Sequence, residues 1–297
     1  MKHKPLKFVL RGVASTRKSI AYYIDSATRG YFADDVFFHA SALSFQVFLC
    51  LIPTVFLLTW VLGIVLSRET LIRQLEIVSA SALPRQVHSV DEIRRLFVSR
   101  AEVFTRHKSI YGAIGLIGFF WTSLGLVSTL RKSIFHILSI HLSQSFLRQT
   151  IYDLRVLLIA GFFLTGSTLV TALFATVREA ALRLPFGYVR LVLVREVVPL
   201  LSGFGLTFLL CFSIYRFLSY GKLRSGPAAF GGVWAAALFE LAKYVFAAYV
   251  THVSELSRVY GTLEVIIGLL LWIFYSTTVF LLGVELSNAK SMRRLAT

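Results

Sequence analysis

Charged residues are scarce in this chain, and cysteines and prolines are few. Only 15% of the 297 residues are charged, whereas a soluble domain usually carries about a quarter. Hydrophobic residues make up 56% of the chain, and the mean hydropathy is +0.72. The two cysteines, Cys50 and Cys211, both fall in apolar stretches and are too few for a structural zinc site, so we expect them to pack as small apolar side chains. This balance argues against an ordinary soluble domain and indicates a membrane protein.

The sequence also lacks the common catalytic motifs. The seven histidines form no H-E-x-x-H cluster, and neither a G-x-S-x-G elbow nor a G-x-x-x-x-G-K-[ST] phosphate loop occurs. His136 and His141 lie beside Arg131 and Lys132, a pattern typical of a basic patch at a membrane surface. We therefore expect no enzymatic activity, no catalytic residue, no metal and no cofactor.

Six long apolar stretches reach the length that a membrane-spanning helix requires. About 20 helical residues, rising about 1.5 Å each, cross about 30 Å of hydrocarbon. Helices also satisfy their own backbone hydrogen bonds, which lipid cannot do for them. The predicted spans are residues 43–66, 110–130, 151–177, 197–218, 227–250 and 262–286. The expected fold is all-α and polytopic, with six transmembrane helices in one domain over residues 37–288.

Three further segments surround these spans. Residues 1–36 mix basic and apolar residues near helical period, which predicts either an interfacial helix or an ordinary cytoplasmic arm. Residues 67–109 predict two amphipathic helices separated at Pro84, either a lid over a cavity or, as we prefer, a packing cap. Residues 289–297 are expected to form a cytoplasmic tail. Because more than thirty residues of charged sequence precede the first apolar run, we expect no cleaved signal peptide.

The excess of positive charge predicts the partners and the orientation of the chain. Its formal net charge is +16, from 31 Lys and Arg against 15 Asp and Glu. In a membrane protein, such an excess favours anionic lipid headgroups over nucleic acid. Basic residues before the first span place the N-terminus inside by the positive-inside rule. With six spans, the C-terminus is then expected inside as well.

Two opposite charges lie within the fifth predicted span. Glu240 and Lys243 are three residues apart, so they can meet on one helix face, and we expect Tyr244 to join them. Because charges in hydrocarbon are costly, this face is expected to look into the protein. One interpretation is a polar cavity that binds a headgroup, an ion or a proton. The other is a self-neutralising pair that fixes helix packing, and we favour the cavity.

A proline interrupts the first predicted span. Ser44 and Gln46 precede Pro53, and a proline inside a helix removes a backbone hydrogen bond and bends the helix. The carbonyl groups that it frees must line a cavity or find partners. Cavity lining and simple bending are equally compatible with the sequence.

Glycines and one further carboxylate predict contacts between helices. Glycine lets backbones approach closely in lipid, so tight packing is expected at the glycines of spans two, three and five. These are Gly112, Gly115, Gly118, Gly161, Gly166, Gly231 and Gly232. Glu285, near the inner end of span six, is expected to meet a base such as Lys222 or Arg224, or to be a buried structural carboxylate.

Several stretches resemble one known family. They read F-G-G-V-W-A-A-A-L-F-E-L-A-K-Y-V-F from Phe230, V-Y-G-T-L-E from Val259, L-L-G-V-E-L from Leu281 and A-S-A-L-S-F from Ala40. Together they resemble the YihY/BrkB family of bacterial inner-membrane proteins over roughly residues 37–286. The resemblance implies six transmembrane helices in the inner membrane with both termini cytoplasmic. The matched positions are Pro53, Trp234, Glu240, Lys243, Tyr260, Gly261, Gly283 and Glu285.

The resemblance also suggests a function. The family has carried a ribonuclease label, but a nuclease would need acidic or histidine residues converging on one water-exposed face, and the sequence predicts none. Some members are associated with export of lipid precursors. Our hypothesis is translocation of an anionic lipid or lipid-linked amphiphile, with Lys243 meeting its headgroup, Glu240 setting or relaying charge, and Pro53 opening span one. The alternative is a non-transporting envelope scaffold, and a homo-oligomer or an envelope partner protein is compatible with either.

Overall fold

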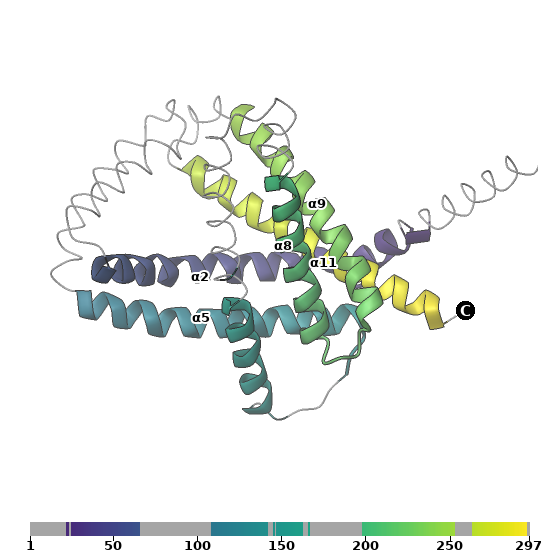
Figure 1. The fold of residues 1–297 in the computed structure, drawn as a ribbon, viewed down its shortest axis with the longest axis horizontal. Helices are drawn as coiled ribbons and strands as arrows, with labels where there is room; N and C mark the ends of the chain where they lie inside the picture. The colour runs from purple at the N-terminus through teal and green to yellow at the C-terminus, as the bar shows by residue number, and fades with distance from the viewer. Residues whose placement is uncertain are drawn as a thin grey trace, which may run out of the picture. The chain divides into compact units, whose positions relative to one another are not determined.

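The computed structural model describes residues 22–65 except 24, 108–162 except 142–144 and 146, residue 166, and 198–295 except 253–262. Its long helices, labelled in Figure 1, are α2 (Val36–Val65), α5 (Lys108–Ile137), α8 (Val198–Leu218), α9 (Ser225–His252) and α11 (Leu263–Leu295). Residues 25–33 and 147–162 are also helical, and the described residues contain no strand. The all-α fold is thus confirmed.

Five of the six predicted spans coincide with long helices. All five helices are long and apolar enough to cross a membrane, which fits a polytopic protein. The predicted third span is helical as far as residue 162, and residues 163–165 and 167–177 lie outside the described part. The predicted segment 67–109 lies outside it except for its last two residues, as do residues 1–21 of the N-terminal arm and residues 296–297 of the predicted tail.

Left-handed backbone conformations mark several helix ends. Tyr220 (φ 51°) and Gly221 (φ 74°) form the turn between α8 and α9, a conformation that ends helices and favours glycine. Pro227 then lies in the first turn of α9, where its missing N–H removes no helical hydrogen bond. Asp35 (φ 46°) separates the helix over residues 25–33 from α2. Short polar turns therefore set the helix bounds.

The chain divides into two compact units. Unit 1 comprises Met1–Ser41, Leu130–Lys243 and Tyr275–Thr297, and unit 2 comprises Ala42–Thr129 and Tyr244–Phe274.

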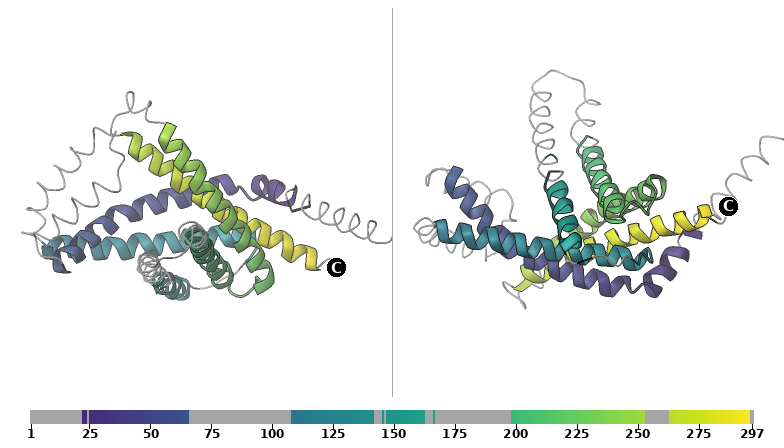
Figure 2. Two further views of the ribbon diagram at one scale, coloured as in Figure 1. Left: turned by 45° about the horizontal axis from the view of Figure 1, so that its top comes forward. Right: turned by 90° about the horizontal axis from the view of Figure 1, so that it is seen from below.

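In unit 2, α2 and α5 lie side by side (Figures 1 and 2). A Cβ added at Gly115 would come within 2.9 Å of the backbone N of Leu57, and one at Gly118 within 3.1 Å of the Pro53 Cβ. At Gly112, an added Cβ would overlap the indole ring of Trp60. The predicted close packing at the glycines of span two is therefore confirmed. At Gly161 and Gly166 of the third span, no described atom lies within 4 Å of an added Cβ.

In unit 1, α8, α9 and α11 meet at a glycine crossing. A Cβ at Gly231 of α9 would overlap the carbonyl oxygen of Gly283 of α11, and one at Gly283 would overlap the hydroxyl of Tyr215. The Tyr215 hydroxyl donates a hydrogen bond of 2.6 Å to the carbonyl oxygen of Phe280. The three helices thus approach so closely that no side chain fits at either glycine. The predicted packing role of Gly231 is confirmed.

Candidate functional site

Glu240 and Lys243 form an ion pair within unit 1. The Lys243 Nζ donates a hydrogen bond of 2.6 Å to the Glu240 Oε1. The Glu240 side chain is only 12% exposed, whereas that of Lys243 is 43% exposed. Gly203 of α8 faces the pair, because a Cβ there would lie 3.3 Å from the Glu240 Oε1 and 3.5 Å from the Lys243 Nζ. The carboxylate is therefore interior, and the ammonium group lies at the edge where another molecule can reach it.

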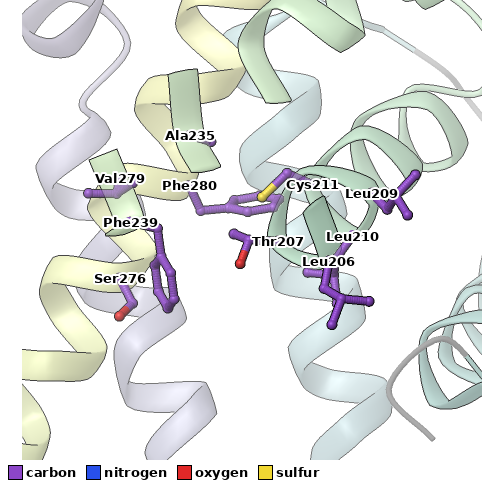
Figure 3. A pocket seen from close by; sticks show the side chains of 10 residues that line it. All are labelled: Leu206, Thr207, Leu209, Leu210, Cys211, Ala235, Phe239, Ser276, Val279 and Phe280. Carbon is purple, nitrogen blue, oxygen red and sulfur yellow. The ribbon is translucent and has the colours of Figure 1, made fainter. Parts of the chain in front are cut away.

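A cavity of about 350 Å³ lies between α8, α9 and α11 in the same unit. Figure 3 shows the α8 side chains Leu206, Leu210 and Cys211 on one side, with Phe239 and Ser276 opposite. The full lining comprises Leu206, Thr207, Leu209, Leu210, Cys211, Ala235, Phe239, Ser276, Val279 and Phe280. Apart from two hydroxyl groups and one thiol, these side chains are apolar. The cavity is therefore suited to a hydrocarbon group.

The ion pair lies on the same helix faces as the cavity lining. Residues four apart share a face of a helix. On α9, Ala235, Phe239 and Lys243 follow one another at this spacing. On α8, Gly203 precedes the lining residue Thr207 by the same spacing. The Lys243 Nζ lies 6.0 Å from the centroid of the Phe239 ring. In unit 1, Lys243 of the charged pair thus lies one helical turn beyond Phe239 of the cavity lining, although neither Glu240 nor Lys243 lines the cavity itself.

Two other residues of α9 that the sequence singled out are more exposed. Tyr244 is 64% exposed, and no described contact joins it to Glu240 or Lys243. Trp234 is 40% exposed and meets Phe230 edge to face, with ring centroids 6.4 Å apart. The spacing correctly indicated that Glu240 and Lys243 can meet, whereas a role for Tyr244 beside them stays a prediction.

The candidate residues of span one lie in unit 2 and not around this cavity. The Gln46 side-chain amide donates a hydrogen bond of 3.0 Å to the carbonyl oxygen of Thr122 on α5. Pro53 is buried at Gly118, and Ser44 is 6% exposed. The described contacts of Pro53 and Gln46 join α2 to α5, and none of the three residues lines the cavity of unit 1.

The family-matched positions of α11 have different surroundings. Gly283 forms the crossing with α8 and α9. Glu285 is buried, with 4% exposure, as one of our two alternatives predicts. The other alternative was wrong, because no ion pair between Glu285 and Lys222 or Arg224 occurs among the described residues. Tyr260 and Gly261 lie outside the described part of the chain.

Sequence reasoning missed a buried ion pair between α5 and the helix over residues 147–162. The Arg131 Nε donates to the Asp153 Oδ1 at 2.8 Å, and the Nη2 donates to the Oδ2 at 3.1 Å. Arg131 is 5% exposed and Asp153 is 4% exposed. The available signal was the position of the two residues in the sequence. Asp153 lies near the start of the predicted span 151–177, and Arg131 directly follows the predicted span 110–130. Both belong to the same predicted side of the membrane.

Two tyrosines lie close to this buried pair. The rings of Tyr152 and Tyr220 stack with centroids 3.9 Å apart. The Tyr152 hydroxyl donates to the carbonyl oxygen of Phe217 at the end of α8. Burial raises the pKa of Tyr220, and its hydroxyl has no hydrogen-bond partner among the described residues. These contacts tie the turn after α8 to the helix over residues 147–162.

Comparison with known proteins identifies the family. A family model described as "Virulence factor BrkB" matches residues 27–297, which is most of the chain. The chain belongs to this BrkB family. The match begins ten residues before the stretch over which the sequence showed a resemblance, so it includes much of the helix over residues 25–33. No solved structure matches the chain.

Relatives in this family are membrane proteins. The UPF0761 membrane protein of Acinetobacter baylyi is 24% identical over 295 residues, covering 97% of this chain and 67% of the relative. That of a Psychrobacter species is 25% identical, covering 86% and 46%. That of Prosthecochloris aestuarii is 28% identical, covering 91% and 60%. The chain thus spans about half to two thirds of the length of these curated relatives. It is an integral membrane protein of the BrkB family.

Proposed function

We propose that this protein binds an anionic lipid or lipid-linked amphiphile in unit 1 and moves it across the bacterial inner membrane, with both chain termini cytoplasmic. The observation that carries the proposal is the cavity of about 350 Å³ beside the Glu240–Lys243 pair. One end of this site suits hydrocarbon, and the other end presents a positive charge. An amphiphile with a negative headgroup combines both properties.

Lys243 is the residue that meets the headgroup. Its ammonium group has three N–H donors, one of which is directed to Glu240. Because its side chain is 43% exposed, the remaining donors can reach a phosphate or carboxylate oxygen. Glu240 holds Lys243 in place while the site is empty and keeps the local charge balanced. Uncharged headgroups gain no comparable interaction.

The size of the cavity limits what it holds. Ligand pockets usually measure about 300–1,000 Å³, so a cavity of about 350 Å³ lies at the lower end of this range. It accommodates part of one hydrocarbon chain beside the headgroup, and the rest of the amphiphile stays in the bilayer. A route that passes only the headgroup through protein needs no large channel.

Reconstitution into vesicles tests this proposal. Protein-containing vesicles with a fluorescent anionic phospholipid in both leaflets are treated with a membrane-impermeant quencher, and the rate at which the inner-leaflet lipid becomes quenched is measured. We expect the anionic lipid to move between the leaflets faster in vesicles that contain the wild-type protein than in protein-free vesicles. Lys243→Gln should reduce this rate about tenfold, because a charge-assisted hydrogen bond contributes about 1.5–3 kcal/mol. Glu240→Gln should also alter it, since the residue holds Lys243.

The matched control is Lys222→Gln, which makes the same change at an exposed base in the turn between α8 and α9. It should leave the rate unchanged. Equal rates for wild type, Lys243→Gln and Glu240→Gln would remove the pair from the mechanism. Rates no faster than those of protein-free vesicles would instead favour the envelope scaffold.

A further inference from the structure

Glu285 presents a second unusual feature of unit 1, about two turns beyond the cavity-lining residues of α11. It is 4% exposed, and its Oε1 has no hydrogen-bond partner among the described residues. A buried carboxylate ordinarily has hydrogen bonds or an opposite charge, because its ionised form is otherwise strongly disfavoured. Among the described residues, Glu285 faces no opposite charge, and the side chain that hydrogen-bonds to it is another carboxyl group, that of Asp34.

The helix over residues 25–33 covers this carboxyl group. A Cβ added at Gly30 would overlap the Glu285 Oε2, and it would lie 2.8 Å from the Glu285 Cδ. The backbone of that helix therefore lies directly against the carboxyl group, at a position with no side chain. Any other residue at position 30 would push the carboxyl group away.

The charged groups around Glu285 do not compensate a negative charge. Asp34, directly after the same covering helix, faces Glu285. The two carboxyl groups repel each other when both are ionised, and they can hydrogen-bond to each other only when one of them holds a proton. The bases nearby have other described contacts. Arg29 pairs with Asp25 at 3.0 Å, Lys290 lies 4.2 Å from the Phe230 ring centroid, and Arg293 lies 5.3 Å from that of Tyr22. Of the described residues, two carboxyl groups therefore face each other without a base.

Aromatic contacts hold the covering helix in place. The rings of Tyr23 and Phe230 lie with centroids 4.7 Å apart, and Arg293 lies over the ring of Tyr23 at 5.6 Å. These contacts join the segment before residue 25 to α9 and α11. With the helix fixed by these contacts, the carboxyl group of Glu285 stays beneath Gly30.

We infer that Glu285 is a proton-binding site, at which one proton is held by the carboxyl group between Gly30 and Asp34. The proton removes the uncompensated charge and lets the two carboxyl groups approach. When it leaves, repulsion from Asp34 weakens the contact between the covering helix and α11. The site binds a proton whether or not the cavity binds an amphiphile, so this inference does not depend on the proposed function.

Infrared spectroscopy of the full chain in lipid nanodiscs tests this inference. The carbonyl stretch of a protonated carboxylic acid is measured as the pH is raised from 5 to 10. We expect wild type to retain a carboxylic acid band at pH 7 that disappears at higher pH. Glu285→Gln should lose one carboxylic acid equivalent at pH 7. Asp25→Asn, a change at an exposed carboxylate of the same helix, should lose none.

A second variant keeps the test decisive if Glu285→Gln does not fold. Asp34→Asn removes the repelling charge and so makes ionised Glu285 less unfavourable. Glu285 should therefore release its proton at a proton concentration about tenfold higher than in wild type, and the band should disappear at lower pH. A wild-type spectrum without a carboxylic acid band at pH 7 would overturn the inference. So would a band that both Glu285→Gln and Asp34→Asn leave unchanged.

Discussion

Units 1 and 2 both bring helices together through glycine, but they differ in what lies beside the contact. In unit 2, glycines of α5 face the backbone and side chains of α2, and the buried polar residues described there are Ser44 and Ser123. In unit 1, glycines form the crossing of α8, α9 and α11. All the buried charged residues that the structure describes belong to unit 1: Arg131, Asp153, Glu240 and Glu285.

This difference in buried charge indicates different roles for the two units. An uncharged contact such as that between α2 and α5 is stabilised by complementary shapes alone, so it suits a rigid structural support. A charged residue in a membrane interior is costly and usually marks a binding site or a transport path. Unit 1 holds such residues together with the cavity. The proposed binding site therefore belongs to unit 1, and the uncharged α2–α5 contact of unit 2 suits a structural role.

The largest expected effect is that of breaking the buried pair of unit 1. Arg131→Met leaves Asp153 buried without its partner, which should lower the free energy of unfolding by about 3–5 kcal/mol. The apparent melting temperature in detergent measures this loss. The double variant Arg131→Met/Asp153→Leu removes both charges and should recover most of it. A double variant as unstable as the single one would show that stability depends on interactions of Arg131 or Asp153 with residues other than each other.

The glycine crossing of unit 1 should show the next largest effect. Gly283→Ala places a Cβ against the Tyr215 hydroxyl and 2.8 Å from the Ala235 Cβ, and such overpacking should cost about 3 kcal/mol. Gly205→Ala on α8 is the matched control, because no described atom lies within 4 Å of its Cβ. It should be neutral or stabilising by up to about 1 kcal/mol. Equal melting temperatures for the two variants would contradict the close packing of α8, α9 and α11 at Gly283.

In unit 2, a smaller effect is expected at Gly115 and Gly118, where an added Cβ has slightly more room than at Gly283. Gly115→Ala brings a Cβ within 2.9 Å of the Leu57 backbone N, which cannot rotate away, and should cost about 1–2 kcal/mol. Gly118→Ala meets only the Pro53 Cβ at 3.1 Å and should cost less. Thermal unfolding of both variants measures the difference. A larger loss at Gly118 would mean that α2 and α5 pack differently.

The smallest expected effect is that of the side-chain hydrogen bond between α2 and α5. Gln46→Leu removes the donor to the Thr122 carbonyl oxygen and should cost about 0.6 kcal/mol, the average for such bonds in membranes. Thr54→Val is the control, because it removes a hydroxyl whose described hydrogen bond, to the carbonyl oxygen of Cys50, lies within α2 itself. The two melting temperatures should differ by a small but measurable amount. A loss of several kcal/mol for Gln46→Leu would give Gln46 a role beyond packing.

The positions of the long helices along the chain were largely predictable, because each depends on a continuous apolar stretch of sequence. The predicted span 197–218 and α8 both end at residue 218, since the turn at Tyr220 and Gly221 follows the apolar run directly. α11 extends nine residues beyond the predicted span, to Leu295. Its last turns are polar and basic, and hydropathy alone could not assign them to the helix. Local patterns therefore fix where a helix crosses the membrane better than where it ends.

Contacts within one helix were easier to predict than contacts between helices. The Glu240–Lys243 bond follows from a three-residue spacing, whereas Tyr244, which the same reasoning included, is 64% exposed. Spacing shows which side chains can meet, whereas the position of α8 determines which of them are covered. The contact of Glu285 with Gly30 joins residues more than 250 positions apart, and no periodicity in either helix encodes it.

Photocrosslinking in the membrane tests binding in unit 1 most directly. Full-length protein is reconstituted with an anionic phospholipid that carries a photoreactive group in its acyl chain, irradiated, digested and mapped by mass spectrometry. We predict adducts on cavity residues such as Thr207 and Phe239, reduced by excess anionic but not zwitterionic lipid, and reduced in Lys243→Gln. Adducts confined to the outer surface of the helices, with the same yield in Lys243→Gln as in wild type, would contradict the account.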